Sequence, residues 1–357
     1  MIQSNIKNKK IFLRTDFNVP LKNGKILDDT KILKGIPTIK YLIKEKAKQI
    51  IICTHLGRPK GKDPNLSTKL LINLLSEKLG LAITHSELPE NGIFSKDRLL
   101  ILLENIRFYD GEESCSPEFS KRLSSLADIY INDSFSVMHR EHASVVGITD
   151  YLPSFIGNSA SREISAIKKF LSPEKNSIAI IGGSKLETKL PIIENLSKKY
   201  DKVLLGSMIG LELIMNYKKF PFKNLIIPKD FIIQRDREIK SINLNEDLTK
   251  ESVKDIGPKT IKEYENYIAS AKTIVWNGAL GQFEEEEFSK GTFSIIKAIA
   301  KSKARKLAGG GETVLSIKKM KLEKEFTHLS TGGGALLEML AGKELPGITA
   351  IKNQLNN

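Results

Sequence analysis

The sequence has few cysteines, few aromatic residues and no long hydrophobic run. Cys53 and Cys115 are the only two cysteines among 357 residues, and no C-x-x-C spacing occurs. Neither a disulfide framework nor a cysteine zinc site is therefore indicated, and we expect both cysteines to be structural. No stretch approaches about 18 consecutive apolar residues, and residues 1–10 are polar and basic without an apolar segment. These absences predict a cytoplasmic protein with no membrane partner.

Negative charge is also scarce: 56 Lys and Arg face 42 Asp and Glu, a formal net charge of +14. A basic protein can bind nucleic acid through release of counterions from the phosphate backbone. The lysines, however, are scattered along the expected helices rather than gathered into one basic arm with interleaved aromatic residues. This favours a lysine-rich surface with a site for a small anionic molecule and no specific nucleic acid. Nonspecific adhesion to polyanions at low salt stays open as an alternative.

Short apolar runs alternate with longer amphipathic segments along the whole chain. This alternation predicts an α/β fold with parallel sheets and crossover helices, and the length predicts about two domains. Helical spacing is clear at 70–79 and 261–271. In open parallel sheets, ligands bind at the carboxyl ends of the strands. The predicted strands are 11–13, 49–53, 99–103, 129–131, 178–181, 203–205, 225–227, 273–276 and 305–308.

In the first half of the chain, the predicted strand ends are rich in residues that bind anions. His55 and Arg58 follow the strand at 49–53, Arg107 follows the strand at 99–103, and Arg140 lies shortly after the strand at 129–131. Guanidinium groups match the geometry of phosphate and carboxylate, so these residues could converge on one small, multiply negative ligand. Any one of them alone would be explained by a surface ion pair, and the four together favour a binding site.

The second half is organised around residues 178–189, in which an apolar run ends in Gly182-Gly183 and two lysines follow. We expect a buried strand and then the first turn of a helix, whose free N–H groups and dipole favour phosphate. Lys185 and Lys189 would lie on one face of that helix. A glycine-rich connection with solvated lysines is the alternative, because this is not the P-loop pattern.

Three further glycine clusters, at 278–281, 309–311 and 332–334, also precede expected helix starts. Glycine allows close approach of the backbone, so the repetition favours a nucleotide, although tight strand-to-helix packing would use glycine in the same way. Glu284 or Glu312 could hold the ribose or a magnesium ion. The acidic run 284–287 is equally compatible with a solvated helix start.

An anion site in one half and a nucleotide site in the other suggest that the two halves act together. The segment 153–173 lies between them, and 161–171 has the pattern of a connecting helix. Two sites on two domains suggest a reaction that needs closure, which would keep water from a labile phosphoryl group. The implied chemistry is phosphoryl transfer between a nucleotide and a small acid.

The chain resembles phosphoglycerate kinase along nearly its whole length. The ordered motifs that carry the resemblance are RTDFNVP, THLGRPKG, LLENIRF, YINDSF with HREHAS, IIGGSKLETK, DIGPKT, VWNGALGQFE, GGGET and HLSTGGGALLEMLAGKELPG. The resemblance implies two Rossmann-like domains with parallel sheets, joined by a hinge helix, in a monomer. It also implies a reversible, in-line phosphoryl transfer between 1,3-bisphosphoglycerate and magnesium ADP on domain closure, a step of glycolysis and gluconeogenesis. The implied boundaries are 1–157 for the phosphoglycerate-binding domain, 158–172 for the hinge, 173–341 for the nucleotide-binding domain and 342–357 for a segment that returns to the first domain.

Motif positions also assign residues to roles. The resemblance implies catalytic roles for Lys31, Lys185 and Arg58, and a contact between Glu312 and the magnesium of the nucleotide. The implied phosphoglycerate contacts are Asp16, Asn18, Lys31, His55, Leu56, Gly57, Arg58, Arg107 and Arg140. The implied nucleotide contacts are Gly183, Ser184, Lys185, Lys189, Gly206, Gly281, Glu284, Gly310, Gly311, Glu312 and Thr313.

Several positions depart from the family pattern. Lys31 stands where the family has an arginine that stabilises the phosphoryl group in flight, and Glu312 stands for an aspartate near the metal. Ser207 replaces a glycine beside the expected adenine, and Gln282 and Ala279 replace an apolar residue and a proline. Residues 136–138 replace a small glycine-containing turn. These changes motivate an alternative function as a related binding or scaffold protein with weakened activity.

Overall fold

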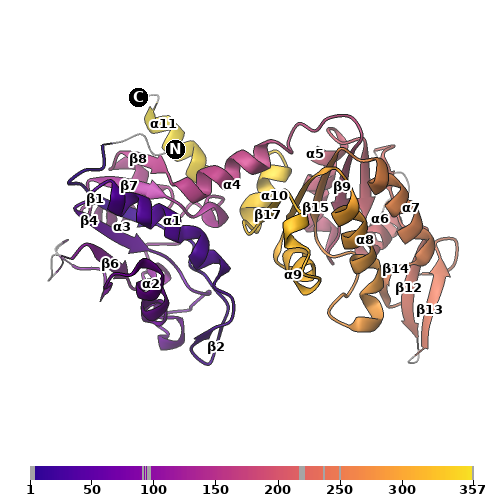
Figure 1. Cartoon of the computed structure of the whole chain (residues 1–357), viewed down its shortest axis with the longest axis horizontal. Helices are drawn as coiled ribbons and strands as arrows, with labels where there is room; N and C mark the ends of the chain where they lie inside the picture. The colour runs from indigo at the N-terminus through magenta and orange to yellow at the C-terminus, as the bar shows by residue number, and fades with distance from the viewer. Residues whose placement is uncertain are drawn as a thin grey trace. The chain divides into compact units, whose positions relative to one another are not determined.

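The computed structural model describes residues 5–90, 92, 94, 98–216, 222–235, 238–248 and 251–355. The chain divides into two compact units, residues 1–165 with 344–357 and residues 166–343, here called the first unit and the second unit. The division falls within helix α4 (Asn158–Lys168). Figure 1 labels the elements of both units, and each unit is described by itself. The domain boundaries given above stay a prediction.

The first unit is built on a six-stranded parallel sheet in the order β5-β6-β4-β1-β7-β8. Ile11 of β1 pairs with Ile50 of β4 on one side and with Ile129 of β7 on the other, so the carboxyl ends of these strands share one edge. All five residues of β4 are buried, as expected for a strand covered on both faces. The strands are β5 (Thr84–Ser86), β6 (Leu100–Leu103), β4 (Gln49–Cys53), β1 (Lys10–Arg14), β7 (Ile129–Asn132) and β8 (Ser154–Ile156).

Helices cover this sheet, and helix α1 illustrates how they pack. Ile32, Ile36, Ile39 and Leu42 of α1 are buried, and their spacing of three to four residues turns one apolar stripe toward the core. The helices of the first unit are α1 (Thr30–Lys44), α2 (Ile72–Leu79), α3 (Pro117–Ser124), α4 to its Ser165 and α11 (Pro346–Leu355). A two-stranded hairpin of β2 (Leu21–Lys22) and β3 (Lys25–Ile26) precedes α1.

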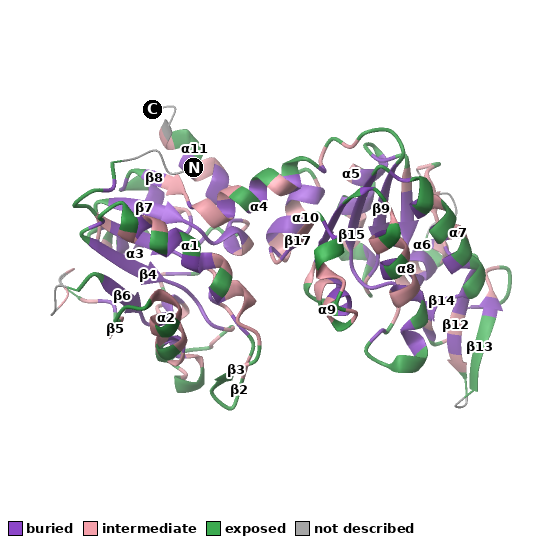
Figure 2. Ribbon diagram, in the orientation of Figure 1, coloured by how far each residue is buried: buried purple, intermediate pink, exposed green. Residues whose placement is uncertain are grey.

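The second unit repeats the plan with a six-stranded parallel sheet in the order β11-β10-β9-β15-β16-β17. Its strands are β11 (Leu225–Ile226), β10 (Lys202–Leu205), β9 (Ser177–Ile181), β15 (Thr273–Asn277), β16 (Arg305–Gly309) and β17 (His328–Ser330). Its helices are α5 (Leu186–Ser197), α6 (Ser207–Asn216), α7 (Pro258–Ser270), α8 (Lys290–Lys301), α9 (Gly311–Lys319) and α10 (Gly334–Leu340). The central strands of the two parallel sheets are fully buried, as the purple of β4, β9 and β15 shows in Figure 2.

A separate antiparallel sheet, β13-β12-β14, completes the second unit. It consists of β12 (Asp230–Arg235), β13 (Glu238–Asn243) and β14 (Val253–Ile256). Four of the six residues of β13 are exposed, so this strand lacks the apolar run by which the other strands were predicted. For that reason β13 was not predicted from the sequence.

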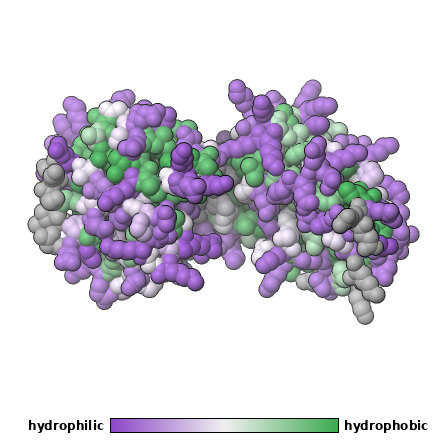
Figure 3. All heavy atoms as spheres, turned by 90° about the horizontal axis from the view of Figure 1, so that it is seen from below, coloured by the Kyte–Doolittle hydropathy of each residue, from purple (hydrophilic) through white to green (hydrophobic). Residues whose placement is uncertain are grey.

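The predicted architecture is confirmed: all nine predicted strands are present within one or two residues of their expected ends. Helices α2 and α7 also lie where the spacing predicted them. None of the helices in the described ranges is both long and apolar enough to span a membrane. On the face shown in Figure 3, hydrophilic residues cover much of each unit, and hydrophobic residues are interspersed among them.

Candidate functional site

The first unit gathers basic side chains at the carboxyl edge of its sheet. We call Lys31, His55, Arg58, Arg107 and Arg140 the basic cluster. His55 and Arg58 follow β4, Arg107 follows β6 and Arg140 follows β7, while Lys31 lies in the first turn of α1. Arg107 lies close enough to Arg140, and Lys31 and Arg107 close enough to His55, for their charges to interact. Arg58 and Arg140 are exposed, so their charges are open to a ligand.

The loop after β4 is held by hydrogen bonds from two other strand ends. The N–H of Gly57 donates to Oδ1 of Asn18 at 2.9 Å, and a guanidinium nitrogen of Arg107 donates to the carbonyl of Gly57 at 2.7 Å. Gly57 has a φ of +62° and a Cβ there would lie 2.9 Å from Leu66, so only glycine fits without strain. The side chain of Leu56 is buried in the core, which leaves its backbone as the part that can face a ligand.

Asp16 joins the basic cluster to the segment after β7. Its carboxylate lies 2.8 Å from the ammonium of Lys31 and accepts a hydrogen bond from the hydroxyl of Ser136 at 2.5 Å. Ser136 belongs to the turn at 136–138 that departs from the family pattern. The substituted turn therefore fixes the carboxylate that pairs with Lys31.

His55 is held in its neutral form. It is buried, and Nδ1 lies 3.3 Å from a guanidinium nitrogen of Arg14. Arginine can only donate, so Nδ1 accepts and the ring proton is on Nε2. Burial, followed by the charges of Arg14, Arg107 and Lys31, holds the pKa of His55 well below its usual range. At neutral pH this ring offers an N–H donor and no charge.

Sequence reasoning missed Arg14, Glu104 and Asn105, although all three belong to quoted motifs or adjoin them. Asn105 is buried and its amide donates to the carbonyls of Leu56 and Leu66 at 2.8 and 2.9 Å. Burial alone would raise the pKa of Glu104, but hydrogen bonds from His85, Ser67 and backbone N–H groups lower it to about 2. These residues support the loops rather than face a ligand. Their role depends on contacts between distant segments, which no local spacing reveals.

The second unit carries a cavity of about 470 Å³ at the carboxyl edge of its sheet, here called the glycine-lined cavity. Its walls come from the loops after β9, β15, β16 and β17. Glycine dominates because Gly183, Gly278 and Gly310 have positive φ values, which other residues rarely adopt. The residues that line it are Gly183, Ser184, Lys185, Thr188, Lys189, Asn277, Gly278, Gly310, Gly311, Glu312, Thr313, Gly333, Gly334 and Leu337.

The expected geometry of the two lysines is corrected by the structure. Helix α5 begins at Leu186, and Lys185 is its N-cap residue with extended backbone, so Lys185 and Lys189 do not share a helical face. The N–H of Leu186 donates to a carboxylate oxygen of Glu212 from α6 at 2.7 Å, so that donor is already taken. The helix starts later because Gly182 to Ser184 form a loop after β9. Both lysines nevertheless line the glycine-lined cavity.

Lys189 is oriented by Asn277, a fourth residue that was missed as a site residue. The ammonium of Lys189 donates to Oδ1 of Asn277, whose amide in turn donates to the carbonyl of Gly309 at 2.8 Å. Burial lowers the pKa of Lys189, while the charge of Glu312 acts in the opposite direction. A bound anion would raise the pKa of Lys189 again, because its charge favours the ammonium form. The arrangement is therefore well suited to a phosphate group.

A smaller cavity of about 120 Å³ shares Gly183, Ser184 and Glu312 with the glycine-lined cavity. Its other lining residues are Ser207, Met208, Lys254, Ala279, Leu280, Gly281, Gln282 and Glu284. The hydroxyl of Ser207 donates to the carbonyl of Leu280 at 2.7 Å and is buried. Gly206 packs behind it, where a Cβ would lie 2.9 Å from Cα of Gly182. The two cavities therefore adjoin each other at these shared residues.

No group of three or more His, Cys, Asp or Glu that could hold a metal occurs in the part of the chain that the structure describes. Glu312 is a single exposed carboxylate, in the first turn of α9, that lines both cavities. Magnesium is usually held by one or two carboxylates together with substrate phosphates. This donor set thus fits a metal that arrives with a nucleotide.

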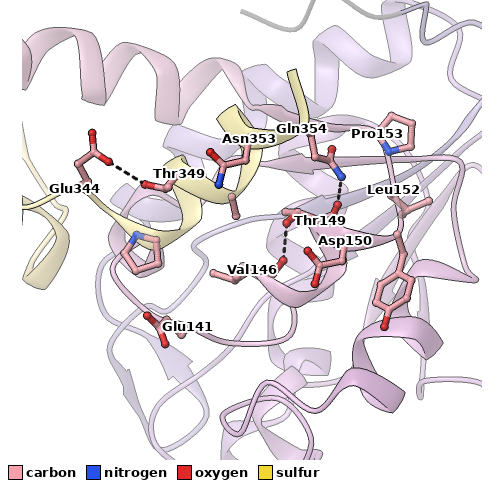
Figure 4. A pocket seen from close by; sticks show the side chains of 13 residues that line it. Glu141, Val146, Thr149, Asp150, Leu152, Pro153, Glu344, Thr349, Asn353 and Gln354 are labelled. Carbon is pink, nitrogen blue, oxygen red and sulfur yellow. Dashed lines mark hydrogen bonds between the residues drawn. The ribbon is translucent and has the colours of Figure 1, made fainter. Parts of the chain in front are cut away.

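A cavity of about 980 Å³ in the first unit contains none of the predicted site residues. It lies between the loop at 146–153 and helix α11, and Figure 4 shows its side chains. Glu141, Asp150 and Glu344 line it and no lysine or arginine does. Three carboxylates would repel a phosphorylated acid, so the basic cluster is the better anion site.

Comparisons with known proteins agree with this geometry. A family model described as phosphoglycerate kinase matches residues 1–220 and 211–343. The phosphoglycerate kinase of Dictyoglomus turgidum is 41% identical over 98% of this chain and 97% of its own length, and that of Finegoldia magna is 40% identical over 97% of each. The solved phosphoglycerate kinase structure from Coxiella burnetii has a TM-score of 0.87 and 34% identity, over 99% of this chain and 98% of that one. The structure from Pyrococcus horikoshii has a TM-score of 0.83 and 32% identity over the same shares.

Proposed function

This chain belongs to the phosphoglycerate kinase family, and we propose that it reversibly transfers the acyl phosphate of 1,3-bisphosphoglycerate to MgADP, which gives 3-phosphoglycerate and MgATP. One observation carries the proposal. Basic residues from separate strand ends gather in the first unit, while the second unit has a glycine-lined cavity with two lysines. One site suits a small phosphorylated acid and the other a nucleotide.

In the first unit, the phosphoglycerate would bind to the basic cluster. The exposed guanidinium groups of Arg58 and Arg140 can each form paired hydrogen bonds with phosphate or carboxylate oxygens. The guanidinium of Arg107 already pairs with Glu113 and the carbonyl of Gly57, so it would add its charge and its remaining donors. His55 would donate from Nε2, and Asp16 and Asn18 would contact the hydroxyl and carboxylate end of the substrate. The loop at Gly57, which Asn18 and Arg107 hold by hydrogen bonds, would keep these residues in place around the substrate.

In the second unit, the phosphates of the nucleotide would occupy the glycine-lined cavity. Lys189 would neutralise the α-phosphate end and Lys185 the transferring group, while Gly310, Gly311 and Thr313 would present backbone and hydroxyl donors. Glu284 would bind the ribose in the smaller cavity. Glu312 would hold the magnesium ion of the nucleotide, which supplies further neutralisation of phosphate charge when bound.

The chemistry is in-line transfer without a covalent enzyme intermediate. Phosphoryl transfer of this kind depends on positioning and charge neutralisation rather than on a nucleophilic side chain. Lys31, Arg58 and Lys185 would stabilise the phosphoryl group in flight. The depressed pKa of His55 supports a binding role for this residue, because a general base needs a pKa near the working pH.

We further propose that the enzyme is a cytoplasmic monomer and that transfer follows closure of the two units, which would exclude water from the acyl phosphate. Light scattering of the purified protein tests the monomer. The alternative of a scaffold protein with weakened activity is not proposed, because relatives with nearly full-length matches carry the enzyme's name.

A coupled assay with purified protein, MgADP and 1,3-bisphosphoglycerate tests the activity. We expect turnover that saturates in both substrates and that is lost in Lys185→Met. Lys198→Met, an exposed residue at the other end of α5, is the matched control and should leave turnover unchanged. Binding of both ligands without turnover in the unmodified protein would contradict the proposal.

A further inference from the structure

The smaller cavity contains a cation that the proposed function does not use. Lys254 lies in β14 and lines this cavity together with Gln282 and Ser207. If the ribose binds Glu284 and the phosphates lie in the glycine-lined cavity, the purine is the part of the nucleotide left for this end of the site. Lys254 would then lie against the base.

The backbone fixes the position of Lys254. Its carbonyl accepts a hydrogen bond from the N–H of Gln282 at 2.8 Å, which joins β14 to the loop after β15. The next residue, Asp255, is buried and accepts from the N–H of Gly291 at 2.6 Å. Side chains alternate along a strand, so Asp255 points into the unit while Lys254 points toward the cavity.

The ammonium of Lys254 is available to a ligand. It is half-buried and lies 5.7 Å from the ring centroid of Phe288, and the described residues show no ion pair to it. The carboxylates of this cavity are Glu284 and Glu312, to which the proposed function assigns the ribose and the magnesium. The face of this ring attracts the ammonium but carries no hydrogen-bond acceptor, so within the described residues the three N–H donors of Lys254 have no hydrogen-bond partner.

Purines differ at the edge that a lysine reads. Guanine and hypoxanthine carry an oxygen at position 6, which accepts hydrogen bonds, whereas adenine carries an amino group there, which donates. Lysine has donors and no acceptor. Both classes of purine also accept hydrogen bonds at N7. An ammonium beside this edge therefore gains a second acceptor, O6, with a 6-oxopurine and meets a donor at that position with adenine.

We propose that Lys254 makes the base site select 6-oxopurine nucleoside diphosphates over ADP. The proposal rests on the proposed function, because it needs the nucleotide to lie in the two cavities as assigned there. Gln282 can donate or accept, so it tolerates either class of base. Lys254 is thus the residue that discriminates.

The test compares kcat/KM for MgADP, MgGDP and MgIDP in the unmodified protein, in Lys254→Met and in Lys262→Met. Methionine keeps the length of the side chain and removes its donors, and Lys262 is an exposed lysine of α7 in the same unit. We expect the unmodified protein and Lys262→Met to prefer GDP and IDP over ADP. In Lys254→Met that preference should fall by about tenfold or more, the factor that one hydrogen bond to a charged group gives, through KM rather than kcat.

Two outcomes would overturn the inference. In the first, all three proteins show the same ratio of kcat/KM between the 6-oxopurine nucleotides and ADP. In the second, Lys254→Met loses kcat/KM by the same factor with ADP, GDP and IDP. The second outcome would assign the lysine to the ribose or a phosphate. Absence of turnover with every diphosphate in the unmodified protein would contradict the proposed function instead. Calorimetric binding of ADP, GDP and IDP would then still decide the role of Lys254. Lys254→Gln, which can donate and accept, should give intermediate selectivity and covers the case in which Lys254→Met does not fold.

Discussion

The ammonium of Lys31 lies 2.8 Å from the carboxylate of Asp16, and the same carboxylate accepts a hydrogen bond from Ser136. Lys31 lies in the first turn of α1 and Asp16 follows β1, so the pair links a helix start to a strand end. The pair is partly exposed, with about a quarter of the Lys31 side chain accessible. Lys31 is therefore held in the basic cluster by Asp16 but remains open to a ligand.

Replacing Lys31 tests whether the ammonium of a lysine can stabilise the phosphoryl group where the family pattern has the planar guanidinium of an arginine. In Lys31→Arg we expect kcat to hold or to rise, because a guanidinium can keep the pair with Asp16 and offer two donors to the phosphoryl group. In Lys31→Met we expect kcat to fall by about 10² to 10³, the usual loss for one charge-stabilising donor. Steady-state assays in both directions measure these effects. A collapse of activity in Lys31→Arg would show that the surrounding site is adapted to lysine.

Lys189 gives a prediction about nucleotide affinity. In Lys189→Met we expect KM for MgADP to rise by about tenfold or more, while KM for 1,3-bisphosphoglycerate changes little, because this cation lines only the nucleotide site. Asn277→Ala should show a weaker form of the same effect, since Lys189 would lose its fixed partner. Lys198→Met is the control on the same helix. A rise in KM for both substrates would contradict the assignment.

His55 gives a prediction about pH. Its pKa is held well below the usual range by burial and by neighbouring cations, so the ring should stay neutral throughout pH 6 to 8. In NMR spectra we expect the ring signals of His55 to show no titration in that range. A plot of KM for 3-phosphoglycerate against pH should likewise have the same shape over pH 6 to 8 in the unmodified protein and in His55→Gln. A titration near pH 6.5 that belongs to His55 would contradict the neutral, donating role.

The sequence predicted the parallel sheets well because their strands are apolar on both faces. The run at 49–53 and the run at 178–181 can be recognised without any tertiary information, and both strands are fully buried. Strand β13 could not be predicted in this way, since most of its residues are exposed and its place depends on pairing with β12.

The site was predicted in part for a similar reason. Charged and glycine residues at strand ends, such as Arg107 and Gly310, carry a local signal. Asn105 and Asn277 do not, because their importance comes from hydrogen bonds to segments 30 to 50 residues away. The two lysines after β9 were placed on one helical face because the loop at 182–184 has no marker that separates it from a helix start.

Asp255, beneath the nucleotide site, gives a prediction about stability. Burial raises its pKa to about 7, against hydrogen bonds from the N–H groups of Gly291 and Ile256 that lower it. Between about pH 4 and 7 the folded protein keeps this proton while the unfolded chain loses it, so a rise in pH favours unfolding. Asp255→Asn removes the group. We therefore consider the free energy of unfolding of Asp255→Asn minus that of the unmodified protein. This difference should rise between about pH 4 and 7, by at most about 1.4 kcal/mol per pH unit, and stay constant above pH 7. Urea unfolding at a series of pH values measures this difference, with the exposed Glu265→Gln as the control. A difference that does not change with pH would mean that Asp255 is ionised in the folded protein throughout.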